Sequence, residues 1–470
     1  MIKGAWRNLA TTMAGLFLLG ACVPQAAGYD DVKNLTSARL GETVHWNEQH
    51  GRPSQADTDR LLEAPLTADS AVRVALLNNQ RLQADFEKLG IARGQWVSAL
   101  RLPNPEVGVA LHYGATERAE IDLDATLSLS QLLFLAWRNG ASEAQLDAAT
   151  IEVASSAVDL AYATRSAFFD YQAAAQRLEL QRTILESLQA SAEMAEQLHR
   201  AGNITDLQRA SERALYEEAR ISYSQVEAKQ LAAREALNAL MGLSGPLGAK
   251  WTVRPELDAP EPVDSLVAQA EQRAIDKSLD LELSRRRLRA AAERVDLARV
   301  EGWVPEVSAG VSAERDSDWG VGPLVQVEVP LLYQGQGETA VAASEARRER
   351  RLLADTQVRI RAQARATSSR LKTAAAGASY YETTVLPLRQ QVLQQTQAEY
   401  NAMSVGVFQL LQAKREQISA AQAYVDLLHD YWIQRSQLEQ LLAGRLPPGR
   451  GADDLPARGE GAMASGQQGH

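Results

Sequence analysis

The sequence predicts a mainly α-helical fold with a small membrane β part, built as two tandem repeats of helix, β-hairpin, long helix and helical hairpin. Three observations predict it. Residues 141–201 contain no glycine or proline and are rich in strong helix formers, so they indicate one helix that would extend roughly 90 Å at about 1.5 Å per residue. After a pair of prolines the hydrophobic period changes from 3.6 to 2. The same order of patterns then recurs about 200 residues later.

The internal repeat is visible in short motifs. Pro105-Glu106-Val107 recurs as Pro305-Glu306-Val307, and Leu82 corresponds to Leu281. We therefore predict a first copy over 66–245 and a second over 263–446, with 246–262 as a link between them. A structural coiled coil is the alternative interpretation of the long helices, but it does not account for their repeated neighbours.

Composition and charge exclude several classes of protein. The chain has 470 residues, of which 45% are hydrophobic and 23% charged, as in an ordinary ordered protein. A net charge of −10 gives no basic surface for nucleic acid, so no nucleic-acid partner is expected. The mean hydropathy of −0.27 argues against several membrane helices. A single cysteine cannot form a disulfide or a cysteine-based metal site within one chain.

The N-terminus has the pattern of a secretory signal. Lys3 and Arg7 precede an apolar stretch that ends in Leu19-Gly20-Ala21-Cys22. We predict a signal peptide over 1–21, and Cys22 is placed like the lipidated cysteine of a bacterial lipobox. The alternative is ordinary cleavage beside a chance cysteine. Val23, rather than Asp, follows Cys22 and favours sorting to the outer membrane. Residues 22–65 are expected to form a polar, irregular, lipid-anchored segment, and 447–470 a disordered tail.

A helix should begin near residues 66–69, with Thr67 or Asp69 as its cap, and continue to about Leu100. It must end there because Pro103 and Pro105 follow.

Two hairpins with one apolar face follow the prolines of the two copies. The turns are expected at 114–120 and at 316–322, the second containing Trp319. Each strand has about the ten residues that a tilted membrane strand needs. A small soluble sheet packed on helices is the alternative. The predicted membrane-facing residues are Val107, Val109, Leu111, Ile121, Leu123, Leu127, Val307, Val311, Val325 and Val327.

The number of strands predicts an oligomer. Hydrocarbon does not tolerate an open sheet edge, because unpaired backbone groups find no water there. Four strands cannot close a barrel, since the smallest membrane barrels have about eight. Two chains would supply eight strands and three would supply twelve.

Each copy ends in a helical hairpin. In the first, Gly202 breaks the long helix and Asp206 opens the next one. In the second, Gly406 lies at the turn. Gly377 and Pro387 interrupt the second long helix, which we expect to bend there.

Taken together, these features resemble the TolC family of outer-membrane efflux proteins, over about residues 66–446. The resemblance implies a homotrimer with a 12-stranded β-barrel in outer-membrane lipid, continued by a periplasmic α-helical barrel. It also implies two protein partners, a periplasmic adaptor (membrane fusion) protein and an inner-membrane transporter that is expected to be proton-driven. The segment Val44-His45-Trp46-Asn47 resembles members paired with metal-ion exporters. The motifs that carry the family resemblance are Ala75-Leu76-Leu77-Asn78-Asn79, the two Pro-Glu-Val strand openers, Val329-Pro330-Leu331-Leu332-Tyr333 with Gly335 and Gly337, and the hairpin tips Ile204-Thr205-Asp206-Leu207-Gln208 and Val407-Phe408-Gln409-Leu410-Leu411.

The resemblance also places a periplasmic aperture at the tip of the second helical hairpin. Some family members carry two acidic residues there, one helical turn apart. This sequence has Gln409 and Gln412 at those positions, so the constriction is expected to be neutral. Tyr400, at the same end, is available for a hydrogen bond between helices. The alternative is that both glutamines merely face solvent.

No catalytic or cofactor motif is found in the sequence. The six histidines have no metal-ligand spacing, and no Walker, GxGxxG, HExxH or GxSxG pattern is present. We therefore expect no enzyme activity, no cofactor and no metal site. Three functions stay open. They are an exit duct of a tripartite efflux system for small molecules or metal ions, a duct for type I protein secretion, and a non-channel structural lipoprotein.

Overall fold

The computed structural model describes residues 28–47, 51, 55–101, 103–113, 119–315 and 319–448. The predicted signal peptide, Cys22 and the tail from residue 449 lie outside the described residues. The described residues form two compact units, the first from those within 28–34, 84–154 and 282–354, and the second from those within 35–83, 155–281 and 355–448.

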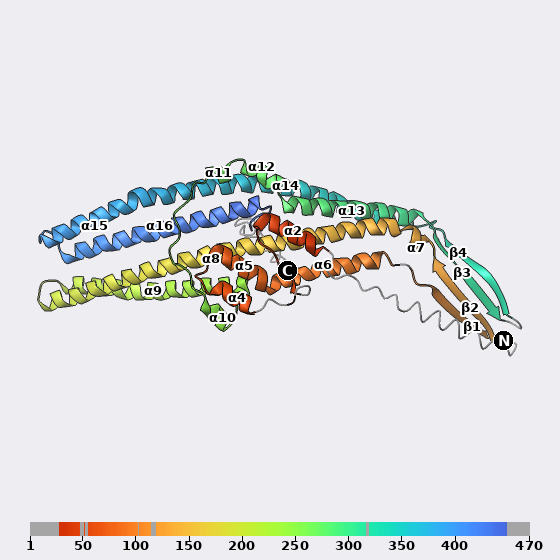
Figure 1. Cartoon of the computed structure of the whole chain (residues 1–470), viewed down its shortest axis with the longest axis horizontal. Helices are drawn as coiled ribbons and strands as arrows, with labels where there is room; N and C mark the ends of the chain where they lie inside the picture. Colours follow the sequence, from red (N-terminus) through yellow and green to blue (C-terminus); the bar gives the residue numbers. More distant parts are fainter. Residues whose placement is uncertain are drawn as a thin grey trace, which may run out of the picture. The chain divides into compact units, whose positions relative to one another are not determined.

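The elements follow the predicted order twice (Figure 1). Those before and within the first copy are α2 (Tyr29–Leu40), α4 (Gln55–Leu62), α5 (Ala68–Asn78), α6 (Gln80–Ala99), β1 (Glu106–Tyr113), β2 (Ala119–Ser128), α7 (Ser130–Leu133), α8 (Leu135–Arg200) and α9 (Asp206–Met241). The link and the second copy contain α10 (Pro246–Lys250), α11 (Asp264–Val267), α12 (Ala270–Asp276), α13 (Leu279–Trp303), β3 (Glu306–Arg315), β4 (Trp319–Glu328), α14 (Gln336–Tyr380), the π-helix η1 (Tyr381–Val385), α15 (Leu386–Asn401) and α16 (Val407–Leu442).

The long helix of the first copy is confirmed. Helix α8 has 66 residues and begins at Leu135, six residues before the predicted start. It ends where Gly202 takes a φ of +75°, a conformation that L-residues adopt only at a cost. Thr205 then caps α9, because its hydroxyl accepts a hydrogen bond from the Gln208 amide at 3.2 Å.

In the first unit, the four strands form one antiparallel sheet in the order β1-β2-β3-β4 (Figure 1). The two hairpins are joined through β2 and β3, with Leu123 opposite Ala313 and Asp124 opposite Ser312. Both hairpins were predicted. The second turn is shorter than predicted, because Trp319 is already the first residue of β4 and pairs with Arg315.

The predicted single helix over 66–100 is wrong, because Asn79 divides it into α5 and α6. The start was right, since Thr67 caps α5. Asn79 takes an extended ψ of 114°, its side-chain oxygen accepts a hydrogen bond from the Leu82 amide at 3.0 Å, and its side-chain nitrogen donates to the Leu240 carbonyl at 2.8 Å. Ser278 does the same at the start of α13, where its hydroxyl accepts from the Leu281 amide at 3.1 Å. The two copies therefore also share a side-chain cap at the start of the helix before the hairpin, Asn79 in the first copy and Ser278 in the second.

The helix ends are also repeated. Gly242 ends α9 with a φ of +66°, and Gly444 follows α16 with a φ of +103°. A Cβ atom at Gly242 would lie 2.5 Å from the carbonyl oxygen of Asn78, and one at Gly444 would meet the carbonyl oxygen of Lys277. Glycine is required at both places because the backbone turns left-handed and passes close to another helix end.

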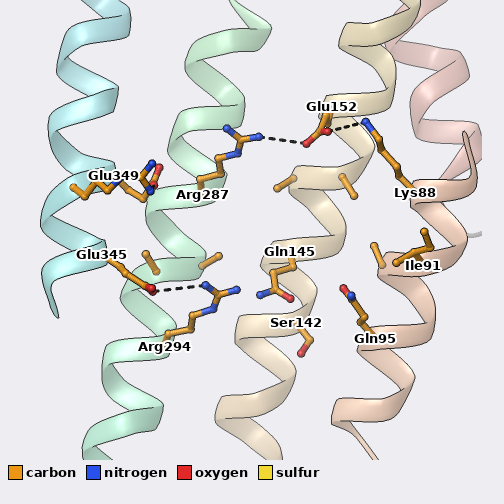
Figure 2. A pocket seen from close by; sticks show the side chains of 16 residues that line it. Lys88, Ile91, Gln95, Ser142, Gln145, Glu152, Arg287, Arg294, Glu345 and Glu349 are labelled. Atoms are coloured by element: carbon orange, nitrogen blue, oxygen red, sulfur yellow. Dashed lines mark hydrogen bonds and ion pairs between the residues drawn. The ribbon is translucent and has the colours of Figure 1, made fainter. Parts of the chain in front are cut away.

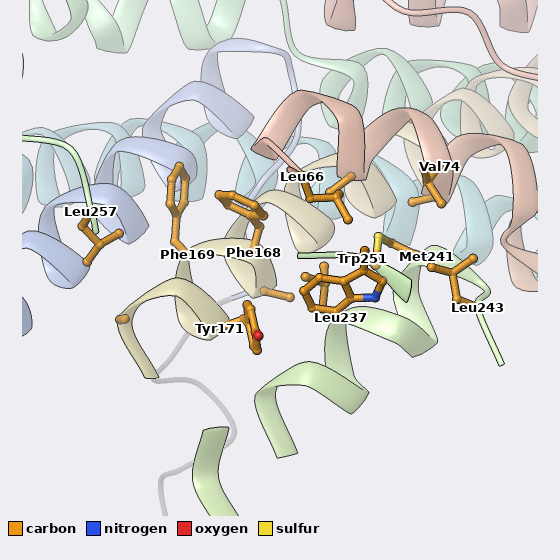
Figure 3. Close-up of a cluster of buried hydrophobic side chains, with 14 of the residues drawn as sticks. Leu66, Val74, Phe168, Phe169, Tyr171, Leu237, Met241, Leu243, Trp251 and Leu257 are labelled. Carbon is orange, nitrogen blue, oxygen red and sulfur yellow. The ribbon is translucent and has the colours of Figure 1, made fainter. Parts of the chain in front are cut away.

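The main hydrophobic cluster of the second unit includes the link between the copies (Figure 3). Trp251 is 1% exposed, stacks edge-on against Tyr171 and donates a hydrogen bond to the Asn238 side chain at 2.7 Å. The guanidinium of Arg234 lies 4.2 Å from the centre of the Trp251 ring. The link is therefore part of the core rather than a passive connection.

The prediction that residues 23–65 are irregular is wrong for the described part. Helices α2 and α4 lie in it, and Trp46 is buried. Gln83 fixes the chain beside Trp46, because its side chain donates to the His45 carbonyl at 2.8 Å and accepts from the Asn47 amide at 2.9 Å. The sequence analysis missed these helices because the segment is mostly polar and only a few of its residues are buried.

The interruption of the second long helix lies at η1, immediately before Pro387. Gly377, which was predicted to share in the break, lies inside the regular helix α14. Proline explains the difference, since it has no backbone N–H to donate and its ring crowds the preceding turn.

Candidate functional site: the sheet and the helical-hairpin tips

The sheet has one apolar face that is open to its surroundings. The register places Val109 opposite Leu123 and Val311 opposite Pro323, so most apolar residues of the four strands lie on the same side, with Leu324 as an exception on the other. Their exposure is high, reaching 73% at Val321. An exposed contiguous apolar face of this kind marks an interaction surface. The large apolar strand residues that are more than half exposed are Val107, Val109, Leu111, Val311, Trp319, Val321, Val325 and Val327.

The opposite face is polar and acidic. Asp122 lies directly across from Glu314, and Asp124 across from Ser312. His112 contacts Asp122, with 3.2 Å between Nδ1 and Oδ2. Among the described strand residues the only arginine, Arg315, lies on the apolar side with its guanidinium 5.7 Å from the Trp319 ring. The sheet therefore separates an apolar surface from an anionic one.

The sheet also has two open edges, at β1 and β4. Each edge carries backbone N–H and C=O groups that the described chain does not pair. Such edges are templates for pairing with another chain, and in hydrocarbon they must be paired.

The second hairpin tip carries the predicted aperture residues. Gln409 is exposed, and its side-chain oxygen accepts a hydrogen bond from the Gly406 amide at 3.0 Å, so it caps α16. Gln412 is exposed too, but it is held on α16 by contacts to Arg415 at 2.7 Å and Glu416 at 2.9 Å. Tyr400 is 38% exposed. Within one chain the two amides lie one turn apart at the start of the same helix.

The first tip is more highly charged. Asp206 opens α9, and its carboxylate lies 3.2 Å from Arg209 and 3.4 Å from His199. No atom lies within 4 Å of a Cβ built at Gly202.

Met403 is a tip residue that the sequence analysis missed. Its φ is +60°, which is unusual for a side chain of this size, and it is 94% exposed. It follows Gly202 by 201 positions, so alignment of the two copies would have found it. The second tip therefore holds a strained, fully exposed apolar side chain where the first has glycine.

Helices α6, α8, α13 and α14 enclose a polar cavity of about 730 Å³ in the first unit (Figure 2). Glu152 lies between Lys88 at 3.0 Å and Arg287 at 3.3 Å, and Arg294 faces Glu345 at 3.9 Å. Ala92, Ala148, Ala149, Ala290 and Ala291 also line the cavity. The acidic side chains that form ion pairs in Figure 2, Glu152 and Glu345, are neutralised by their basic partners. The cavity therefore resembles a solvent-exposed surface with paired charges rather than a catalytic centre.

The described residues contain neither a cluster of metal ligands nor a membrane-spanning helix. Among them, no three His, Cys, Asp or Glu side chains gather as metal ligands would. His45 bonds the Gly51 carbonyl at 2.7 Å, and His429 bonds Asp170 at 2.6 Å. None of the described helices combines the length and the apolar character needed to cross a membrane.

Comparison with known proteins points to one family. Residues 71–243 match the family model described as outer membrane efflux protein. Over these residues the chain is similar to the TolC family of outer-membrane efflux proteins. It is 22% identical over 422 residues to the cobalt-zinc-cadmium resistance protein CzcC of Cupriavidus metallidurans, covering 86% of this chain and 98% of that protein.

Solved structures agree with the TolC-family fold. Crystal structures of CusC match with a TM-score of 0.66 and 19% identity, covering 82% of this chain and 94% of that chain. The CmeC outer membrane channel of Campylobacter jejuni matches with a TM-score of 0.65 and 14% identity, covering 80% of this chain and 85% of that chain. At these identities the structural likeness establishes the fold.

Proposed function

We propose that this chain is the outer-membrane exit duct of a tripartite efflux system. One observation carries the proposal. A single chain presents a four-stranded sheet with an exposed apolar face, an acidic face and two open edges. Such a sheet is stable in a bilayer only as part of a closed ring with its apolar face toward lipid. A ring of this kind encloses a polar lumen, which conducts without catalysis.

The proposed assembly is a homotrimer. Three copies of four strands give twelve, and the β1 edge of one copy would pair with the β4 edge of the next. The helical hairpins would extend into the periplasm, where their tips meet a periplasmic adaptor and, through it, a proton-driven inner-membrane transporter. Lipid attachment at Cys22 is proposed as a further anchor in the outer membrane.

Divalent metal cations are the cargo that we favour among small solutes. The related protein CzcC is named for resistance to cobalt, zinc and cadmium. The acidic face adds support, because among the strand residues that the structure describes His112 is the only basic neighbour of Asp122, Asp124 and Glu314. A lumen lined by carboxylates attracts cations.

Planar-bilayer recording of the purified full-length protein tests the proposal. Stepwise conductance and a trimeric mass in detergent are the expected results. A monomer that gives no conductance would overturn the duct. Cargo is tested separately by deleting the gene and measuring growth on cobalt, zinc and cadmium, where sensitivity to at least one metal is expected. Unchanged growth on all three, with conductance intact, would reject metal cargo only.

A further inference from the structure

The second unit contains a cavity of about 580 Å³ that the proposed duct does not use. Four segments line it, namely residues 65–69 at the start of α5, residues 165–172 of α8, residues 254 and 258 of the link, and residues 432–439 of α16. We call it the link cavity. Small-molecule sites in proteins have volumes of about 300–1,000 Å³ and combine an apolar lining with a few polar groups. The link cavity has the size of such a site.

The apolar part of the lining is aromatic. Phe168 and Phe169 are 5% and 8% exposed, and Figure 3 shows them on the same side of α8, beside Leu66. The Trp432 ring of α16 stacks on Phe169, with 4.9 Å between the ring centres and 23° between the ring planes. Aromatic surfaces of this kind pack well against another ring.

Acidic side chains outnumber the arginines that they contact. Arg165 lies 2.7 Å from Asp69 and 3.0 Å from Glu439. Arg435 lies 3.0 Å from Glu439 and 2.8 Å from Glu261. Two arginines therefore share three carboxylates. The excess negative charge favours a cation in the cavity and disfavours an anion.

The main donors of the link cavity are engaged within the chain. Arg254 pairs with Asp258, so this pair adds no net charge. The Trp432 indole N–H donates to the Asp258 carbonyl at 3.0 Å. The side-chain nitrogen of Gln172 donates to the carbonyls of Arg254 at 2.8 Å and of Glu256 at 2.6 Å. A ligand therefore finds few N–H groups with which to bind as an anion.

The groups that remain open are acceptors. Gln172 is only 6% exposed and lines the cavity, and no group among the described residues bonds its side-chain oxygen. The carboxylates of Asp69 and Asp258 are each 68% exposed, and each bonds its arginine through Oδ1. Amide and carboxylate oxygens accept hydrogen bonds and do not donate them. A matching ligand must therefore supply the donors.

We propose that the link cavity binds an organic monocation with an aromatic body, as in an arylalkylamine. The ring would pack on Phe169 and Trp432, and the ammonium group would donate to Gln172 and to the exposed carboxylates. Aromatic ring faces also attract cations, which adds to the preference for an amine. The site is complete within one chain, so it does not depend on the proposed trimer or on conduction.

Titration with three indole compounds of similar shape tests the charge preference. The probes are tryptamine, which is a cation at neutral pH, the alcohol tryptophol, and the anion indole-3-propionate. Ligand-observed NMR is recorded on the full-length protein in lipid nanodiscs, and empty nanodiscs give the background from lipid. We expect a Kd of about 1 mM or less for tryptamine. Tryptophol should bind about tenfold more weakly because the ion pairs are lost, and indole-3-propionate should not bind.

Two sets of variants place the binding in the link cavity. Asp69→Asn combined with Asp258→Asn removes the exposed carboxylates and should reduce the preference for tryptamine over tryptophol from about tenfold to about twofold. Glu63→Gln is the matched control, because it removes an exposed charge close to residues 65–69 but outside the cavity lining, and it should keep the preference. Ala68→Trp fills the cavity and should abolish binding of tryptamine and tryptophol alike.

Equal affinity for tryptamine and tryptophol, or binding by Ala68→Trp that matches the wild type, would overturn the site. A preference that survives in the double asparagine variant would do the same, and this variant decides if Ala68→Trp does not fold. Failure of the site and failure of the duct are distinguishable, because conductance is measured without these probes. A conducting protein that does not bind tryptamine loses the site alone.

Discussion

Replacement of Arg445 by methionine should destabilise the second unit strongly. Arg445 follows α16 and contacts two carboxylates from distant parts of the chain. Its Nη2 lies 2.5 Å from Asp159, and its Nη1 bonds Asp280. Arg445 and Asp280 are each only 17% exposed in their side chains, whereas Asp159 is 38% exposed. Methionine keeps much of the volume and removes the charge, so Asp159 and Asp280 would lose the guanidinium that both of them contact.

The size of the effect follows from the burial of these groups. Removing one partner of a buried ion pair costs about 3–5 kcal/mol. Asp159 can turn toward water, so we expect about 3 kcal/mol, near the lower limit. For a unit of this size that corresponds to a fall of about 3–6 °C in the unfolding midpoint.

The loss should depend on pH. Burial raises the pKa of Asp280, and Arg445 acts against that rise. Without Arg445 the pKa rises further, so the folded state takes up a proton more readily than the unfolded state does. The destabilisation is therefore full above the raised pKa of Asp280 and shrinks as the pH falls through it.

The unfolding midpoint of Arg445→Met and of the wild type is measured by circular dichroism in detergent, at one fixed heating rate, at neutral pH and near pH 5. Arg445→Met combined with Asp280→Asn should recover part of the loss, because the buried charge is gone. Arg351→Met, at an exposed position on α14, is the matched control. The prediction is wrong if Arg445→Met has the same unfolding midpoint as the control at neutral pH, or if its destabilisation increases as the pH falls.

Three further predictions concern single positions. In Gly242→Ala the new side chain must adopt a positive φ and clashes with a backbone oxygen, whereas in Gly202→Ala the new Cβ atom has open space and should cost only about 1–2 kcal/mol. The thermal unfolding midpoint should therefore fall further for Gly242→Ala. Equal midpoints for the two variants would contradict the close approach at Gly242. Conductance through an aperture of Gln409 and Gln412 should change by less than about twofold between about pH 5 and 8, because amides do not titrate where perturbed carboxylates do. Gln412→Asp should introduce a pH dependence, and a several-fold reversible change already present in the wild type would reject a neutral aperture. Asn79→Ala removes a helix cap and should cost about 1–2 kcal/mol, which hydrogen exchange at the first turn of α6 would detect as faster exchange.

Patterns that depend on neighbours along the chain could be predicted. The 66-residue helix α8 follows from a stretch without glycine or proline. The strands follow from alternation of apolar and polar residues, and the register indeed places Val109 and Leu123 on one face and Asp124 on the other. The capping residues Thr67 and Gly202 were found for the same reason, because the conformation each requires is set locally.

Features that depend on distant partners could not be predicted. Asn79 breaks a helix that propensity favours, because its side chain bonds the carbonyl of Leu240, which is 161 residues away. Trp251 looks like part of a linker, yet its burial depends on Tyr171 and Asn238.

The sequence by itself determined the long helices and the strands of the two copies, where the second copy begins, and which strand face is apolar. Local propensity and periodicity are enough for these, since each residue's preference is expressed through its nearest neighbours. Only the tertiary structure decided that β2 and β3 join the two hairpins into one sheet and that hydrogen bonds such as Asp159 to Gln440 and Gln181 to Gln422 join α8 to α16. Both depend on contacts between residues about 180 to 280 positions apart, whose geometry is fixed only when the intervening chain has folded.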